Sequence, residues 1–148
     1  VQTTLGLRPQ LSTEVRETAL STYTSSTLTN VDCESVLAKM SALMQTNKIY
    51  ENTDLNLPNL AQSLGLSSHQ LSELINAKLG KGFSRYLREQ RIKAAKTLLC
   101  DEPSASILSV GLSVGFTSQS NFYEAFREIE GMTPGQFRKL NTKGRNTK

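Results

Sequence analysis

The stretch GFTSQSNFYEAFREIEGMTPGQFRK, residues 115–139, predicts a turn, a helix, a second turn and the start of another helix. Gly115 suits the positive φ that follows a helix end, and Ser118 can cap the helix that comes next. Gly131 ends this helix, and Thr-Pro-Gly-Gln at 133–136 begins the following one with a capping box and a proline at its first position. The apolar residues of the central helix recur at helical spacing, at Phe122, Ala125, Phe126 and Ile129.

The same pattern occurs earlier in the chain, at residues 59–87. Gly65 matches Gly115 at an offset of 50, and after the turn the offset is 51, so that Ser67 matches Ser118. Each copy has a short helix, a tight glycine turn and a second helix with a polar outer face, which is the pattern of a helix-turn-helix. The other matched positions pair Ala61 with Gly111, Leu71 with Phe122, Glu73 with Glu124, Ile75 with Phe126, Gly80 with Gly131 and Tyr86 with Phe137.

A longer helix over residues 83–99 is predicted between the two copies. Arg91 falls on its apolar stripe, where an unpaired buried guanidinium would cost on the order of several kcal/mol. Arg91 therefore either braces the two subdomains through a buried carboxylate or contacts a phosphate. The apolar positions of this helix are Phe83, Leu87, Ala94, Ala95 and Leu98.

The predicted fold is all-α, with two helix-turn-helix subdomains joined by a long linker helix. Residues 1–31 contain twelve Ser or Thr and are interpreted as a linker, with a short helix near Thr13–Leu20. A capped helix starts after Asp32, and its methionines, Met40 and Met44, are interpreted as core rather than as a binding surface. The predicted parts are the linker at 1–31, the first subdomain at 32–82, the linker helix at 83–99 and the second subdomain with a basic tail at 100–148.

Composition limits the function classes. No apolar run approaches the length of a bilayer span, and no signal peptide opens the chain. The two cysteines, Cys33 and Cys100, have no metal-site spacing, and the chain has one histidine, so zinc lacks ligands. We expect both thiols to be reduced and the protein to be cytoplasmic, without metal or cofactor.

Positive charge is concentrated in the segments that follow the second helix of each helix-turn-helix copy. Residues 78–96 hold seven Lys or Arg against Glu89, and residues 132–148 hold five basic residues and no acid. Such a distribution is expected of a surface that faces phosphate. A solvated helix face with a basic tail would give the same counts.

These features resemble the AraC/XylS family of bacterial transcription regulators over about residues 32–140. The most specific part is the second copy, with Gly115-Phe116, Phe122, Phe126, Gly131, Pro134 and Phe137-Arg138, and the linker helix matches at Arg91-Ile92, Ala95 and Leu98-Leu99. The resemblance implies seven helices, with both recognition helices in successive major-groove segments of double-stranded DNA, and RNA polymerase as a protein partner. A fainter likeness, at Tyr23–Leu28, Leu43-Met44, Tyr50 and Leu55, is to members that carry an N-terminal sensory or membrane module, so that the chain could be the cytoplasmic domain of a longer, membrane-anchored protein.

The chain departs from the family pattern at two kinds of position. Gly111 replaces the usual alanine, which costs about 1 kcal/mol in a helix interior and predicts a looser second unit. Glu73 and Glu124 stand where members often carry arginine or another polar residue. A glutamate cannot bind phosphate, but it can accept a hydrogen bond from the cytosine amino group.

The leading hypothesis is sequence-specific binding of double-stranded DNA, because a helix fits the major groove and its polar outer residues meet base edges. Base contacts are predicted for His69, Ser72, Glu73, Gln119, Ser120, Tyr123 and Glu124. Backbone contacts are predicted for Ser68, Asn76, Lys78, Lys81, Arg85, Ser118, Asn121 and Arg127.

Two other classes of function remain open from the sequence. A helical interaction or dimerisation module is favoured slightly by the two acidic outer residues and opposed by the basic segment. An enzyme acting through Cys33 or Cys100 lacks an activating partner, since no histidine lies near either cysteine in the sequence. We therefore predict no catalytic residue and no enzyme activity.

Overall fold

The structure, a computed structural model, describes residues 27–142, and within this range it contains helices and turns but no strand. This agrees with the predicted all-α fold of seven helices. The prediction of a linker over 1–31 with a helix at Thr13–Leu20 falls outside the described residues, except for a turn at 27–30. The elements are α1 (Cys33–Gln45), the short 3-10 helix η1 (Ile49–Glu51), α2 (Leu57–Ser63), α3 (Ser68–Leu79), α4 (Phe83–Asp101), α5 (Ile107–Ser113), α6 (Gln119–Glu130) and α7 (Pro134–Thr142).

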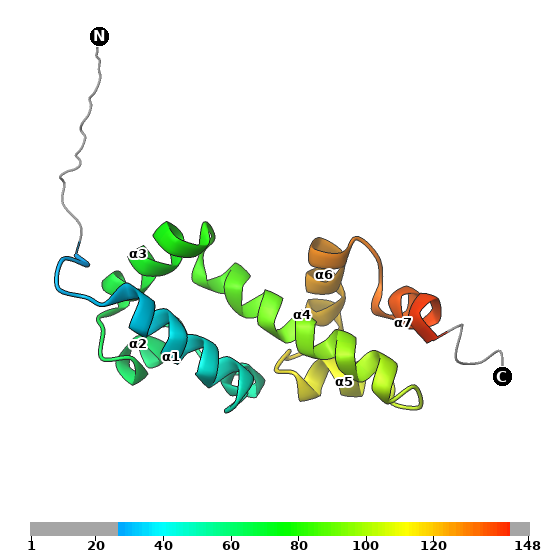
Figure 1. Ribbon diagram of the computed structural model, residues 1–148. Coiled ribbons are helices and arrows are strands. Elements are labelled where there is room, and N and C mark those ends of the chain that lie inside the picture. Colours follow the sequence, from blue (N-terminus) through cyan, green and yellow to red (C-terminus); the bar gives the residue numbers. More distant parts are fainter. Residues whose placement is uncertain (1–26, 143–148) are drawn as a thin grey trace, which may run out of the picture.

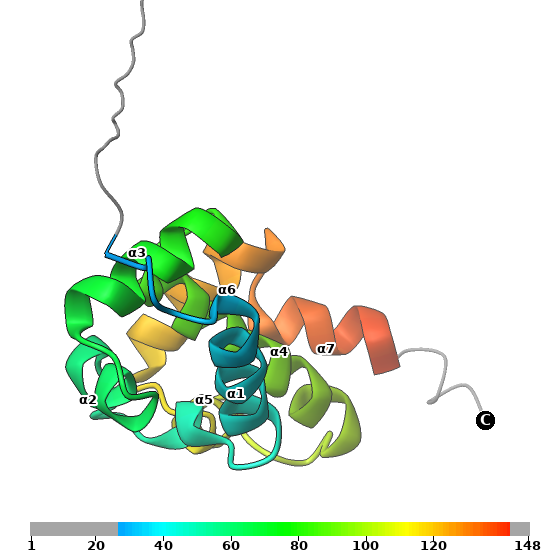
Figure 2. The ribbon, with the colours of Figure 1, turned by 60° about the vertical axis from the view of Figure 1, so that its left-hand side comes forward.

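Two groups of helices are joined by α4 (Figure 1). The first group contains α1, α2 and α3, the second contains α5, α6 and α7, and α4 contacts η1 and α3 of the first as well as all three helices of the second. Figure 2 brings the α3 end forward and shows α1 and α2 on the near side of α4. The linker helix is therefore part of both hydrophobic cores.

The helices start where the sequence supplies a capping oxygen. The predicted caps at Asp32, Ser67 and Ser118 accept a hydrogen bond from the backbone N–H three residues on, and Asn56 and Ser106 do the same for α2 and α5. The predicted capping box of Thr133 with Gln136 forms, and Ser67 forms a second one with Gln70. The second helix of each unit ends at a glycine in the left-handed region, Gly80 at φ 70° and Gly131 at φ 77°.

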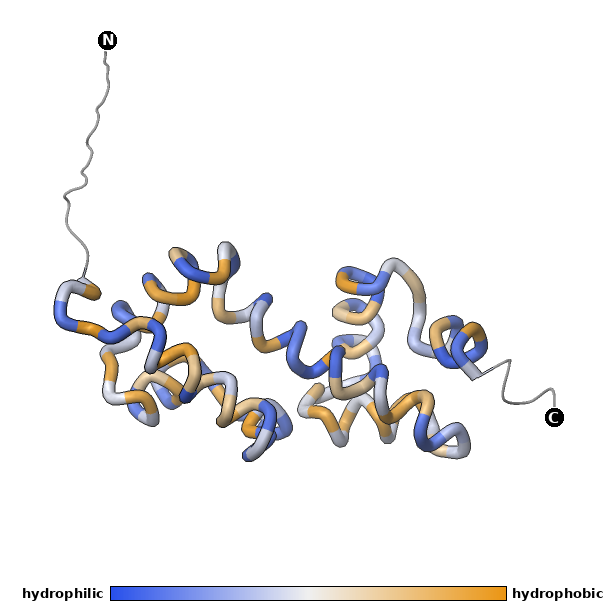
Figure 3. Tube along the Cα trace, viewed as in Figure 1, coloured by the Kyte–Doolittle hydropathy of each residue, from blue (hydrophilic) through white to orange (hydrophobic). Residues whose placement is uncertain are grey.

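The buried face of α4 differs from the predicted stripe. Leu87 and Ala95 are buried as expected, but Tyr86, Ile92 and Leu99 complete the face, while the other predicted positions, Phe83, Ala94 and Leu98, are partly buried. The face is wider than one helical stripe because α4 packs against both groups. Between the groups its surface is largely hydrophilic (Figure 3).

Arg91 braces the two units, but without the predicted carboxylate. Its Nε donates to the backbone carbonyl of Tyr50 at 2.8 Å and its Nη2 donates to that of Asn52 at 2.9 Å. The same guanidinium lies 5.8 Å from the ring centre of Phe116, at the turn of the second unit. Desolvation by burial lowers the pKa of Arg91. Within residues 27–142 the expected ion pair is not formed, because the carbonyls of Tyr50 in η1 and of Asn52 directly after it satisfy the donors instead.

Candidate nucleic-acid interface

The outer face of α6 brings together the four base-contact candidates of the second unit and Arg127, which the sequence assigned to the DNA backbone. Gln119, Ser120, Tyr123, Glu124 and Arg127 line one shallow depression. The opposite face of the same helix is anchored by Phe122 and Phe126, both fully buried. The aromatic core thus fixes the direction in which the polar face points.

The outer face of α3 is partly covered. His69 and Asn76 are exposed, whereas Ser72 and Glu73 are half-buried. The backbone N–H and the hydroxyl of Thr27 both donate to Oε1 of Glu73, the former at 2.9 Å. The segment that precedes α1 therefore lies against the first recognition helix.

Gln70 strengthens this contact, because its Nε2 donates to the carbonyl of Thr27 at 3.2 Å while its Oε1 completes the capping box. The sequence did not predict this contact. The pairing joins residues more than forty positions apart, and no periodic pattern marks it.

Several residues assigned to the DNA backbone already have a role in the helices. The hydroxyl of Ser118 accepts from the N–H of Asn121 at 3.1 Å, and Asn121 donates from Nδ2 to Thr117 at 2.9 Å. Asn76 donates to the carbonyl of Ser72 at 2.8 Å. Ser68 opens α3 and is half-buried. A phosphate contact from these residues would come from backbone N–H groups or from a rearranged side chain.

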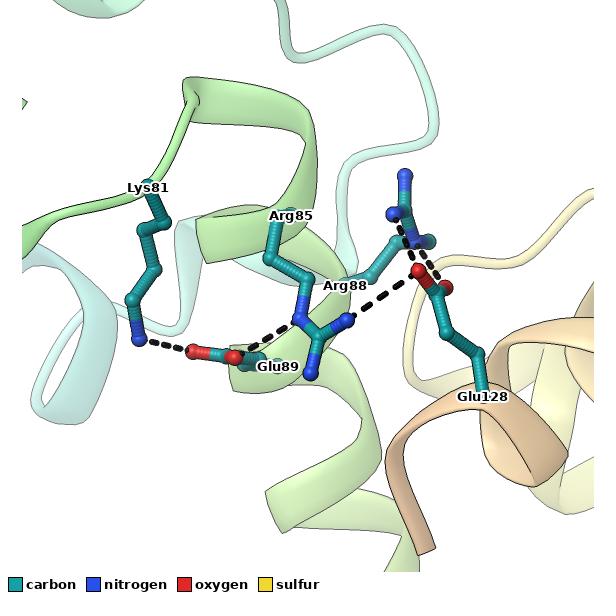
Figure 4. Close-up of polar contacts among 5 residues, drawn as sticks. All are labelled: Lys81, Arg85, Arg88, Glu89 and Glu128. Atoms are coloured by element: carbon teal, nitrogen blue, oxygen red, sulfur yellow. Dashed lines mark hydrogen bonds and ion pairs between the residues drawn. The ribbon is translucent and has the colours of Figure 1, made fainter. Parts of the chain in front are cut away.

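The basic segment at 78–96 is not an open row of cations. Lys81 and Arg85 bind Glu89, the latter at 2.8 Å, and Arg85 and Arg88 bind Glu128 (Figure 4). Lys96 binds Glu130 at 3.2 Å. The two acids from α6 are remote in sequence, so the local charge count did not include them. Lys78 remains exposed on α3.

The ionisation of the two central acids reflects these bonds. The hydrogen bond from Arg88 lowers the pKa of Glu128 below its ordinary value. For Glu89, partial burial raises the pKa. The hydrogen bonds and charges of Lys81 and Arg85 lower the pKa by more than burial raises it, so the net shift is downward. Both groups are therefore carboxylates at neutral pH.

Arg88 is a residue that the sequence analysis did not assign. It shares a depression with Asn121, Glu124 and Glu128 of α6, and it also borders a groove lined by Leu55 and other residues around the start of α2. Its position three residues after Arg85 on the same helix was the available signal, because i and i+3 side chains are neighbours.

Residues 27–142 show no arrangement suited to metal binding. No three His, Cys, Asp or Glu side chains in this range are grouped so that they could hold a metal ion. Cys33 and Cys100 are both half-buried. Every helix of this range is also too short or too polar to cross a bilayer.

The sequence of this chain is similar to a known family and to known regulatory proteins. A family model described as a helix-turn-helix domain matches residues 60–140. The melibiose operon regulatory protein of Escherichia coli K12 is 33% identical over 101 residues, which are 67% of this chain and 33% of that protein. The chain therefore spans about a third of the length of this curated relative.

Solved structures share the arrangement of helices. A transcriptional regulator of Chromobacterium violaceum, described as having an AraC-type DNA-binding domain, has a TM-score of 0.58 and 29% identity, covering 71% of this chain and 96% of that one. The DNA-binding domain of AdpA, solved with a target DNA, has a TM-score of 0.64 at 22% identity and covers 78% and 97%. At that identity AdpA supports the fold alone.

Proposed function

The chain belongs to the AraC/XylS family of helix-turn-helix transcription regulators, and from this premise we propose that it binds double-stranded DNA sequence-specifically through both of its units. In this proposal α3 and α6 enter adjacent major-groove segments on one face of the duplex. The observation that carries it is the duplicated unit, in which a buried apolar face orients a polar face outward twice on one linker helix.

We propose base contacts from α6 by the residues of its depression, with Gln119 suited to adenine and Glu124 suited to the amino group of cytosine. On α3 we propose His69, Ser72 and Glu73 for the same role. Phosphate contacts fall to Lys78 and Arg127, which are exposed, and to the helix starts at Ser68 and Ser118, where backbone N–H groups favour anions. Asn76 and Asn121 complete this set. Lys81 and Arg85 can join it only by exchanging their carboxylate partners for phosphate.

The length of α4 is compatible with this arrangement. Its 19 residues span about 28 Å at 1.5 Å per residue, and the recognition helices are offset from its ends. Successive major-groove faces are about 34 Å apart. A single chain can therefore read two neighbouring segments without a palindromic site.

The experiment is a binding titration on a selected duplex and on the same duplex with five base pairs inserted between the half-sites. The insertion rotates one half-site to the opposite face, which a rigid α4 cannot follow. We expect affinity to fall to that of a single unit, as measured with a duplex carrying one half-site. Unchanged affinity would contradict the two-unit arrangement, and no binding to any selected duplex would contradict DNA binding itself.

Transcription regulation by the whole protein involves parts that lie beyond this domain. We propose RNA polymerase as a partner and the cytoplasm as the location, which are supported by the regulatory role in the name of the melibiose relative. An N-terminal sensory or membrane module preceding this domain is part of the same proposal. Co-purification of RNA polymerase with the full-length protein on its target duplex tests the first partner.

A further inference from the structure

The ion pairs between α4 and α6 differ from the other arginine contacts of the domain. Arg91 and Arg138 donate to backbone carbonyls, Arg138 to that of Leu99 at 2.9 Å, so both fasten elements of the fold. Arg85 and Arg88 instead converge on one carboxylate, that of Glu128 (Figure 4). They are the only two guanidinium groups that share an acceptor residue within residues 27–142.

The geometry at Glu128 is that of an anion held by two guanidinium groups. Arg88 donates from Nε to Oε1 at 3.0 Å and from Nη2 to Oε2 at 3.1 Å, and Arg85 donates from Nη1 to Oε2 at 3.1 Å. Such a planar fork fits phosphate oxygens as well as it fits a carboxylate. The three side chains are 39%, 34% and 42% exposed for Arg85, Arg88 and Glu128, so an anion from solution can reach the guanidinium groups.

This site lies between the two units on the side of the proposed base contacts. Arg88 borders the depression that contains Asn121 and Glu124 of α6. It also borders the groove at the start of α2 in the first group. Figure 1 shows that the N-terminal half of α4 lies between α3 and α6. A duplex that touches both recognition helices carries its backbone across this part of the molecule.

We propose that Arg85 and Arg88 form a phosphodiester-binding site for the DNA backbone between the two half-sites, which Glu128 occupies in the free protein. The inference rests on the proposed function and deepens it. Exposed ion pairs are weakly held because water screens both charges, while a phosphate that takes the place of Glu128 also releases counterions from the duplex. Glu128 therefore lowers non-specific affinity, since every duplex must displace it.

The test measures duplex affinity against salt concentration for Glu128→Gln, with Glu130→Gln as the matched control. Both changes remove one negative charge from α6, but Glu130 binds Lys96 rather than the two arginines. Long-range repulsion from DNA is reduced equally in both. We expect Glu128→Gln to tighten binding to a random duplex about three- to tenfold more than Glu130→Gln. Equal effects, or weaker binding by Glu128→Gln, would overturn the inference.

Arg88→Gln separates a direct phosphate contact from a change in net charge. We expect it to weaken binding more in the Glu128→Gln background than in the wild type, because the arginine is available there without competition. Lys93→Gln is the control, since Lys93 is an exposed cation of the same helix. If Arg88→Gln and Lys93→Gln weaken binding equally in both backgrounds, the arginine makes no contact and the inference fails.

Two further measurements keep the outcome unambiguous. Glu128→Asp retains the charge but shortens the side chain, so it should give part of the gain even if Glu128→Gln proves unstable to thermal unfolding. The Nε–Hε signal of Arg88 in an NMR titration should shift on addition of wild-type target duplex, and a constant signal would count against the site. If the wild-type protein binds duplex DNA and Glu128→Gln changes the affinity no more than Glu130→Gln does, this inference alone is refuted. If the protein binds no duplex, the proposed function is refuted along with it.

Discussion

The two helix-turn-helix units follow one sequence pattern but fill their cores differently. In the second unit, Phe116, Phe122, Phe126 and Phe137 form a chain of ring contacts with centroids 5.3, 5.8 and 5.5 Å apart. The matched positions in the first unit hold Leu66, Leu71, Ile75 and Tyr86. A common backbone pattern therefore tolerates a mostly aliphatic core and an aromatic core, provided that neighbouring positions compensate for the volume.

The compensation is visible at the short helix of each unit. A Cβ at Gly111 would lie 2.6 Å from Cδ2 of Phe122, so the phenyl ring fills the space that a methyl group would need. The first unit holds the opposite pair, Ala61 with Leu71, both buried. Gly111 was expected to loosen the second unit, but the structure gives it the role of admitting a larger ring.

The turn glycines differ as well. Gly65 has φ 73° and open space around the position of a Cβ, whereas Gly115 has φ 111° and a Cβ there would lie 2.2 Å from the Tyr50 carbonyl oxygen and 2.6 Å from Arg91 Nε. Gly65 is favoured only because its positive φ is one that other residues rarely adopt. Gly115 also allows the turn of one unit to touch η1 of the other group, which fixes the orientation of both.

The largest effect is therefore expected from Gly115→Ala compared with Gly65→Ala. Strain at positive φ costs about 1–3 kcal/mol in either turn. Gly115→Ala also displaces a backbone carbonyl and Arg91, so we expect a total loss of about 4 kcal/mol or more in unfolding by urea. Losses that are equal within error would show that the close approach of the two groups does not hold them together.

Arg91→Ala should rank second, and Arg138→Ala is its counterpart in the second unit. Removing Arg91 leaves the carbonyls of Tyr50 and Asn52 without their donor, and the loss at the part-buried Tyr50 carbonyl alone costs about 1–3 kcal/mol. We expect a loss of about 3 kcal/mol and a more independent motion of the units. Arg138→Ala should destabilise the domain without freeing the units from each other, because its bonds to Leu99 and Glu102 join α7 to the C-terminal end of α4 and not to the first group.

Unfolding followed separately in each unit by hydrogen exchange distinguishes these two variants. After Arg91→Ala, amides of α3 and α6 should exchange with different protection. If they remain equally protected, Arg91 does not couple the units.

The exchange of volume between paired positions is tested by Gly111→Ala. Overpacking against Phe122 should cost about 1–3 kcal/mol, despite the higher helix propensity of alanine. Adding Phe122→Leu should recover part of that loss, since the pair then equals Ala61 with Leu71. A stabilised Gly111→Ala protein would show that the ring moves aside at no cost. Failure of Phe122→Leu to compensate would instead show that the second core depends on its aromatic contacts.

The features predicted correctly from the sequence are those encoded locally. Helix caps such as Ser67, the closing glycines and the buried positions Leu71 and Phe122 depend on neighbours within a few residues, and the repeat allowed each copy to support the other. The identity of the fold followed from this regularity.

The features that were missed depend on contacts between distant segments. The carbonyl partners of Arg91, the binding of Glu128 to Arg88 and the contact of Thr27 with Glu73 each join positions at least 39 residues apart. Charge counted along the chain therefore described the basic segment as open, although acids from α6 lie against it. The candidate base contacts could be located on helix faces, but their accessibility could not.

The smallest expected effect concerns the two matched acids, Glu73 and Glu124. Glu124 is exposed in the depression of α6, whereas Glu73 accepts two hydrogen bonds from Thr27. Loss of a cytosine contact relaxes the choice at one base pair by about 1–3 kcal/mol. We expect Glu124→Ala to fall within this range and Glu73→Ala to fall below about 1 kcal/mol, because the carboxylate of Glu73 is engaged within the protein.

Thr27→Val determines whether that engagement is the cause. Valine removes the hydroxyl donor and keeps the shape and the backbone N–H, so it weakens the hold on Glu73 without emptying the position. The measurement is the affinity for a target duplex in which each base pair is replaced in turn. In Thr27→Val the base preference should become stronger at the position read by α3 and stay unchanged at the position read by α6. The preference gained should disappear when Glu73→Ala is added. If Thr27→Val leaves both positions unchanged while Glu73→Ala and Glu124→Ala relax the sequence preference equally, the two units read DNA alike and the turn before α1 has no part in recognition.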